Sequence, residues 1–214
     1  SRQDRRPNFT TVVLLGIVDV SSSAATRGLR CAELATSEPL SSVQFYRTLL
    51  KWQVLQFEFG FDCWVGDRRC ASVHTARHGQ RGGWRLIFAG GAQNSSLTGP
   101  DDTHAGLVKG RAQHGPWAPS PRTGEPCWVD LLTNDGDRAD MFWLDTLHWT
   151  VQNGQSTSVY ATEGRPIAIR REPNYSHGLP GWLCYFTVDD VADARHQVLA
   201  LDGRVLSEEQ HPIM

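Results

Sequence analysis

Short stretches of alternating hydrophobic and polar residues follow one another along this chain, and they predict strands separated by a few helices. Residues Cys31–Ala35 alternate as a half-buried strand does, and Pro39–Lys51 repeats its apolar positions with a helical period. The next two strands, Phe57–Val65 and Cys70–Thr75, are joined by a polar turn. A further strand is predicted at Trp84–Ala89. The glycine-rich residues after it, ending in Gly-Pro, argue against a regular helix there.

The same order of elements returns in the second half of the chain. A strand at Cys127–Leu132 precedes a helix with Asp135 as its N-cap, and the next strands are Thr157–Tyr160, Pro166–Arg170 and Trp182–Val188. A last helix is capped by Asp190 and stopped by Gly203. Its apolar positions are predicted to face inward: Val191, Ala194, Val198 and Leu201.

The two halves also align residue by residue. At an offset of 97 residues Glu33 falls on Asp130 and Trp52 on Trp149, and after a one-residue slip Trp84 meets Trp182. Matches in this order indicate an internal duplication. We therefore predict an extension at 1–28, a first half at 29–120, and a second half at 121–214 that lacks its C-terminal strands. Within the extension, Val12–Val20 is predicted to be a buried strand, with a signal peptide as the weaker alternative.

Composition excludes several partners. The chain has 214 residues, a formal net charge of -2 and 40% hydrophobic residues, so we expect neither nucleic acid nor a membrane surface as a partner. The apolar run at 12–20 is too short to span a bilayer. Five cysteines without paired CxxC spacing predict reduced thiols and a cytoplasmic location, with Cys63 and Cys70 half-buried beside a turn.

Two segments carry a family resemblance. The first is Cys127-Trp128-Val129-Asp130-Leu131, followed by an Asp-capped helix that ends in Leu-x-Trp; the second is Trp182–Val205, with F-x-VDDV and G-x-V. Together with their counterparts in the first half they resemble the glyoxalase/bleomycin resistance/dioxygenase (vicinal oxygen chelate, VOC) superfamily, most closely its two-domain actinobacterial glyoxalase-like or hydroxylase-like branch. The resemblance covers residues 29 to 214.

The resemblance implies an α+β fold of tandem βαβββ-type modules, whose curled mixed sheets form a ligand cleft. After His114 and again after His211 the family has two further strands, which this sequence lacks. Either the cleft is more open, or the strand Val12–Val20 or a second chain completes it, and we expect a homodimer.

The resemblance also implies where a metal ion would bind. In metal-dependent members a ligand lies seven residues before the acidic helix cap of each module. In this chain those positions hold Cys31, Arg85, Trp128 and Leu183. These residues cannot form the oxygen and nitrogen shell of a catalytic metal ion. We expect no metal and no cofactor.

The remaining candidates form a polar and aromatic cleft. Glu33 and Asp130 lie two residues beyond the ligand positions and share their face, so each is a candidate general base. Arg85 is predicted to pair with Glu33 or with a ligand oxygen. Candidate substrate-binding side chains line the walls: Trp128, Arg85, Trp64, Tyr160, Tyr185, Trp84, Trp182 and His74. Trp52 and Trp149 are predicted to be structural, and His114 and His211 to be solvated at the rim.

Two functions fit this pattern. The first is a metal-independent enzyme that isomerises, cyclises or hydroxylates a small aromatic or polyketide-like molecule, with a carboxylate as base. The alternative is a protein that binds or sequesters such a molecule, for example an antibiotic, without chemistry, as in the bleomycin-resistance branch. A fold of this kind hosts many chemistries, so the sequence does not name the ligand.

Overall fold

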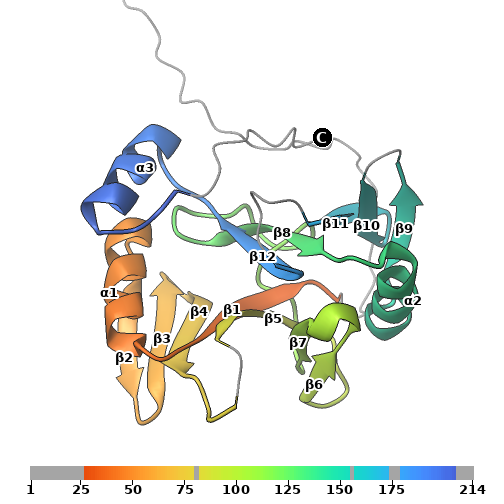
Figure 1. The fold of residues 1–214 in the computed structure, drawn as a ribbon, viewed down its shortest axis with the longest axis horizontal. Helices are drawn as coiled ribbons and strands as arrows, with labels where there is room; N and C mark the ends of the chain where they lie inside the picture. The colour runs from red at the N-terminus through yellow and green to blue at the C-terminus, as the bar shows by residue number, and fades with distance from the viewer. Residues whose placement is uncertain (1–26, 80–81, 155–156, 174–178, 206–214) are drawn as a thin grey trace, which may run out of the picture.

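The computed structural model describes residues 27–79, 82–154, 157–173 and 179–205. Within these ranges the chain forms two mixed sheets, here called sheet A and sheet B, and three α-helices (Figure 1). The predicted strand Val12–Val20 and His211 lie outside the described residues. None of the helices in these ranges is long and apolar enough to cross a membrane.

Sheet A begins with a complete βαβββ unit. Its elements are β1 (Leu29–Thr36), α1 (Pro39–Leu50), β2 (Gln53–Phe57), β3 (Gly60–Val65) and β4 (Arg68–Thr75). The sequence predicted a single strand at Phe57–Val65. This is wrong, because the chain turns at residues 58–59 and separates β2 from β3. A Cβ on Gly60 would lie 2.3 Å from the carbonyl oxygen of Val73, so β3 can begin there only with glycine.

A shorter second unit completes sheet A. Its strands are β5 (Gly83–Phe88), β6 (Ser95–Thr98) and β7 (His104–Leu107), with a 3₁₀ turn at Pro100–Asp102. The strand order is β2-β3-β4-β1-β5-β7-β6, with β5 antiparallel to β1 and parallel to β7. The expectation that no regular helix follows β5 is confirmed.

Sheet B repeats the first part of this topology. It contains β8 (Pro126–Leu132), α2 (Gly136–Leu147), β9 (Thr150–Asn153), β10 (Ser158–Thr162), β11 (Arg165–Arg171) and β12 (Gly181–Phe186), and α3 (Val191–Ala200) follows. Its order, β12-β8-β11-β10-β9, matches β5-β1-β4-β3-β2 of sheet A. The predicted duplicated α+β architecture is confirmed.

Local chemistry places the helix ends where the sequence predicts them. The carboxylates of Asp135 and Asp190 accept backbone N–H bonds at the starts of α2 and α3. The helices α1 and α2 end at Lys51 and His148, both with φ near +55°, and these two residues are 97 positions apart. The duplication thus extends to an unusual backbone conformation just before Trp52 and Trp149.

The two sheets pack against each other through β5 and β12. Their shared core contains an aromatic cluster of Phe88, Trp143, Trp149 and Trp182, with ring centroids 5.1 to 6.4 Å apart. Trp52 is also buried, so the structural assignment of Trp52 and Trp149 is confirmed. Because each sheet uses one face for this packing and for its own helix, the opposite face of each sheet points outward; we call it the outer face (Figure 1).

Three predictions of burial are wrong. Val191 is 76% exposed, so its predicted inward position is wrong, whereas Ala194, Val198 and Leu201 are half-buried, as predicted, while α3 packs mainly on α1. His114 is buried, because its segment returns to β1 and forms a bridge to Leu29. Cys63 and Cys70 are fully buried, and burial raises the pKa of each thiol to about 12. All five cysteines are free thiols.

Candidate functional site

Glu33 and Arg85 form an ion pair on the outer face of sheet A. They are register partners on β1 and β5, and Nη2 and Nε of Arg85 donate to Oε2 of Glu33 at 2.5 and 3.1 Å. A third nitrogen of Arg85 donates to the hydroxyl of Ser96 on β6. The Glu33 side chain remains 21% exposed. The pair that the sequence predicts is present, and solvent reaches it.

Other candidates share this face, but Trp84 does not. Glu33 lies in register with Ser72, which lies in register with Asp62; Trp64 and His74 are two positions from this row and so point to the same side. Trp84 points to the opposite side, where it packs on Tyr46 and Phe186. The prediction that Trp84 lines the ligand face is therefore wrong, because neighbouring residues of a strand alternate between faces.

Cys31 occupies the first of the family's ligand positions and is fully buried on this face. Nη2 of Arg69 lies 3.5 Å from its sulfur, and Nη1 of Arg69 pairs with Asp62 at 3.2 Å. Burial raises the pKa of the Cys31 thiol, although Arg69 acts in the opposite direction. Cys31 is thus a protonated packing residue at ordinary pH.

Asp130 lies at the equivalent position on the outer face of sheet B and is only 2% exposed. The indole N–H of Trp128 donates to its Oδ1 at 2.9 Å, and the hydroxyl of Tyr185 donates to its Oδ2 at 2.7 Å. The guanidinium of Arg171 also bonds to Oδ2 and donates to the Tyr185 oxygen at 2.8 Å. We call these four residues the Asp130 cluster. It brings together three sequence-predicted residues and one that the sequence did not identify.

The Asp130 cluster holds two aromatic rings beside each other. Trp128 on β8 and Tyr185 on β12 are register partners, and both remain half-buried. Burial and the neighbouring charge of Asp130 raise the pKa of Tyr185, so its hydroxyl stays protonated. A buried carboxylate needs such donors, since an unpaired charge is costly inside a protein. The cluster therefore fixes the orientation of both rings.

Tyr160 and Trp182 lie in the core, so their assignment to the ligand face is wrong. Tyr160 is fully buried, and its hydroxyl donates to Asp140 of α2 at 2.6 Å. Tyr160 also does not correspond to Trp64, because at the 97-residue offset it falls on Cys63, which points inward as well. A slip of one residue along a strand exchanges its two faces.

The strand topology could have identified Arg171 as a neighbour of Asp130, but the hydrophobic periodicity of the sequence could not. The strand β11 runs parallel beside β8, so a cationic residue near its end approaches Asp130. Either Arg170 or Arg171 could take that place. The bulge between β10 and β11 decides the face, and Arg170 instead pairs with Asp140 on the inner side.

The family's metal-ligand positions do not fit a metal ion. Trp128 and Leu183 offer no metal-binding atom, Cys31 is packed against Arg69, and Arg85 brings a positive charge. No group of three or more His, Cys, Asp or Glu side chains within the described residues could hold a metal ion. The mismatch lies in the donors, so we assign no step to a metal.

A surface crevice lies away from both outer faces. It has a volume of about 90 Å³ and lies between the end of α1, the start of α3 and Thr123. Pockets for small organic ligands usually measure about 300–1,000 Å³. The crevice is too small for an aromatic molecule, and its Asp189 already pairs with Lys51 at 2.7 Å.

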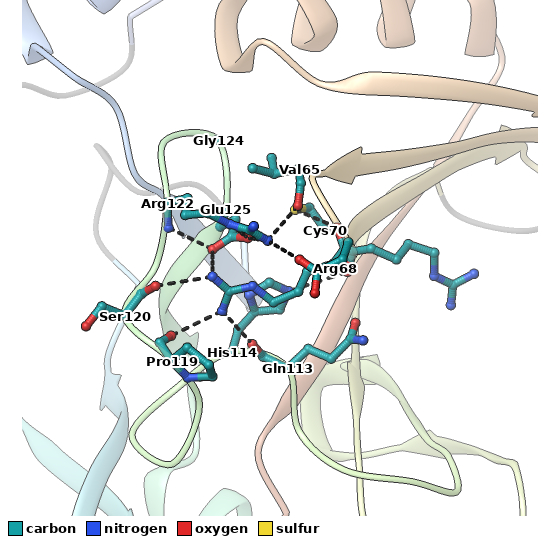
Figure 2. A network of polar contacts seen from close by, with 12 residues as sticks. Val65, Arg68, Cys70, Gln113, His114, Pro119, Ser120, Arg122, Gly124 and Glu125 are labelled. Atoms are coloured by element: carbon teal, nitrogen blue, oxygen red, sulfur yellow. Dashed lines mark hydrogen bonds and ion pairs between the residues drawn. The ribbon is translucent and has the colours of Figure 1, made fainter.

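A buried charged network fastens the segment between the two sheets (Figure 2). Glu125 is fully buried and pairs with Arg68 at 2.5 Å and with Arg122 at 2.8 Å. Arg68 also donates to three backbone carbonyls of this segment: Gln113, Pro119 and Ser120. Arg122 donates to the carbonyl of Val65. The charged groups are satisfied by one another and by the backbone, so we interpret this network as a structural clasp.

Comparisons with known proteins identify the fold. No protein-family model and no curated protein matches the chain. Among solved structures, a variant of homoprotocatechuate 2,3-dioxygenase from Brevibacterium fuscum matches 86% of the chain with a TM-score of 0.54 and 12% identity. A catechol 2,3-dioxygenase matches 84% of the chain and 82% of its own length, with a TM-score of 0.56 and 9% identity. BphC, a halotolerant catechol dioxygenase, matches 84% of the chain and 77% of its own length, with a TM-score of 0.53 and 13% identity.

These similarities establish the fold and no more. The chain spans 64% of the length of the homoprotocatechuate dioxygenase. Identities of 9 to 13% do not carry an activity from one protein to another. The predicted VOC fold is confirmed.

Proposed function

Because the chain has the vicinal oxygen chelate fold, we propose that it binds a small aromatic molecule on the outer face of sheet B, without a metal ion at the family's ligand positions. The proteins of similar fold are named as catechol and homoprotocatechuate dioxygenases, and one of them is described as ring-cleaving. Those names specify aromatic substrates. The five free thiols fit a protein of the cytoplasm.

The Asp130 cluster is the observation that carries this proposal. Trp128 and Tyr185 are held by hydrogen bonds to one buried carboxylate, so a planar ligand would meet two rings whose orientation is already fixed. Preorganisation of this kind reduces the entropy lost on binding.

The same cluster favours binding over catalysis at Asp130. A general base must accept a proton from the ligand, but both oxygens of Asp130 already accept hydrogen bonds from the protein. Its negative charge also lies against the Arg171 guanidinium. We therefore assign Asp130 the role of positioning the two rings.

A metal-independent enzyme remains the second candidate, with Glu33 as its base. Both hydrogen bonds from Arg85 end on Oε2 of Glu33, which leaves Oε1 outside the pair on a partly exposed side chain. Proton transfer by Glu33 would suit isomerisation or cyclisation, whereas hydroxylation would in addition require dioxygen as the oxidant and oxygen source. This candidate requires that an aromatic compound is recovered from the protein chemically changed, and that Glu33→Gln abolishes the change.

Thermal-shift and calorimetric titrations with catechol and homoprotocatechuate, in the presence of EDTA, test the binding proposal. Trp128→Ala should weaken binding by about 1–3 kcal/mol, because it removes one of the two rings. The control is Trp64→Ala, a half-buried tryptophan on the outer face of sheet A, which should leave the affinity unchanged. Absence of binding to either compound, or equal losses in the two variants, would contradict the proposal.

A further inference from the structure

The strand β2 is a free edge of sheet A. Within the described residues it pairs with one neighbour, β3, and Figure 1 shows it at one end of the sheet. In an antiparallel pair, successive residues direct their N–H and C=O groups alternately toward the partner and away from it. About half of the backbone groups of β2 therefore face outward, as a template for another strand.

The side chains at this edge are unusually apolar. Leu55 and Phe57 are 62% and 43% exposed at alternate positions of β2, and Phe59 in the turn that follows is 71% exposed. Large apolar groups gathered on a surface commonly mark a contact with another protein.

The other edges differ from β2 in this respect. The edge strands β6 (SSLT) and β9 (TVQN) have four residues each and are largely polar, and β12 packs against β5. Proteins usually protect an edge with lysine, proline or a very short strand. The strand β2 (QVLQF) contains no charged residue and no proline. The strand β9 (TVQN), which is equivalent to β2 in the second half of the chain, is therefore more polar than β2.

We propose that β2 is the contact surface between two copies of this chain, which join their sheets A edge to edge in an antiparallel, twofold-symmetric pair. With the twofold axis at Leu55, that residue meets its own copy, and Gln53 meets the partner's Phe57. Val54 and Gln56 then exchange the outward-facing backbone bonds across the axis. Symmetric contacts of this kind are self-complementary, because the same patch serves both copies.

Charge favours a second copy over an unrelated strand. Exposed Lys51 precedes β2 and exposed Glu58 follows it, so the two ends of the edge carry opposite charges. Lys51 also pairs with Asp189, but its side chain remains 65% exposed in that surface pair. In an antiparallel pair each Glu58 approaches the partner's Lys51. Opposite charges across neighbouring strands stabilise the pairing, and a parallel arrangement would place like charges together.

Sedimentation equilibrium of the full chain at several concentrations tests this interface. The wild type should sediment with twice the monomer mass, and Leu55→Arg should sediment as a monomer with an unchanged circular dichroism spectrum. The control is Met141→Arg, since Met141 is 74% exposed on α2, which packs beside β9 in the second half of the chain; this variant should remain dimeric. A monomeric wild type at every concentration would overturn the proposal, as would a dimer that survives Leu55→Arg or is lost in Met141→Arg.

A cross-linking experiment keeps the proposal testable if Leu55→Arg does not fold. Leu55→Cys places two thiols across the twofold axis, where paired Cβ atoms come close enough for a disulfide. Mild oxidation should give a covalent dimer for Leu55→Cys and none for Met141→Cys. Equal amounts of covalent dimer in both variants, or none in Leu55→Cys, would contradict the pairing at β2.

Discussion

At the scale of single residues, Asp130 and Glu33 occupy equivalent positions but have different surroundings. Asp130 is buried with Arg171, whereas Glu33 and Arg85 are partly exposed. Removing one member of a buried ion pair leaves the other charge without compensation, at a cost of about 3–5 kcal/mol. Asp130→Asn should therefore lower the free energy of unfolding by about that amount, as measured by urea denaturation.

Glu33→Gln is the matched control for Asp130→Asn. An ion pair that solvent can reach contributes about 0–1 kcal/mol, so this variant should unfold at nearly the wild-type urea concentration. Equal losses of stability in the two variants would show that Asp130 is no better shielded than Glu33.

His114 makes the stability of the protein depend on pH. Burial lowers its pKa to about 4, with Arg68 and Arg122 adding to this effect and Glu125 and the Arg69 carbonyl opposing it. Between pH 6.5 and 4 the unfolded chain binds the proton more readily than the folded chain, so stability falls as the pH is lowered through this range. The loss due to this group should reach about 3 kcal/mol at pH 4.

His114→Gln isolates that contribution, because glutamine keeps an N–H near the Arg69 carbonyl but does not titrate. Urea denaturation at pH 7 and pH 4 should show a smaller loss for the variant than for the wild type. The same loss in both proteins would exclude His114 as the cause.

Prediction of single residues succeeded where regular alternation along a strand decides which face of the sheet a side chain takes. Glu33 and Arg85 were paired correctly, because β1 and β5 are regular where they meet. Tyr160 was misplaced because it was aligned with Trp64 and not with Cys63, its equivalent at the 97-residue offset, whereas Arg171 was missed because a bulge between β10 and β11 changes which face the residues of β11 take. His114 was misjudged because its contacts, Leu29 and the Arg69 carbonyl, come from distant parts of the chain.

At the scale of elements, we expect the clasp around Glu125 to contribute more to the free energy of unfolding than the short length of the fastened segment suggests. Arg68→Met leaves the buried Glu125 with Arg122 alone and removes the donor to three carbonyls, so we expect a loss of about 3–5 kcal/mol. Chymotrypsin should also cleave after Trp117 faster than in the wild type.

Arg122→Met is the control for the clasp, because Arg122 is partly exposed and Arg68 remains in place. Its loss should be about 1 kcal/mol. If the two arginine variants unfold alike, then the buried contacts of Arg68 do not hold the segment.

Element-level prediction depended on packing. The helices α1 and α2 and strands β1, β4 and β8 bury one face, and their periodicity was sufficient to locate them. The strand β2 was missed because its alternate apolar residues face solvent. On α3 the periodicity correctly predicted the inward side at Ala194, Val198 and Leu201 but not the exposure of Val191, because periodicity shows that a helix has an apolar side but not how far its partner covers it.

At the scale of the whole molecule, the duplication determines the number of candidate sites. The sequence indicated a cleft with residues from both halves, but the sheets stack through their inner faces, so the Glu33–Arg85 pair and the Asp130 cluster lie on separate outer faces. This separation could not be predicted, because it depends on the contact between β5 and β12.

The central claim is the proposal that the Asp130 cluster fixes two aromatic rings for a ligand by hydrogen bonds, with no metal ion at the family's ligand positions. Elemental analysis of the purified protein, followed by calorimetric titration with Mn²⁺ and Fe²⁺, tests it most directly. We predict less than a tenth of an equivalent of bound metal and no saturable heat. One equivalent of metal that stabilises the fold, and is lost in Asp130→Asn while Glu33→Gln retains it, would contradict the account.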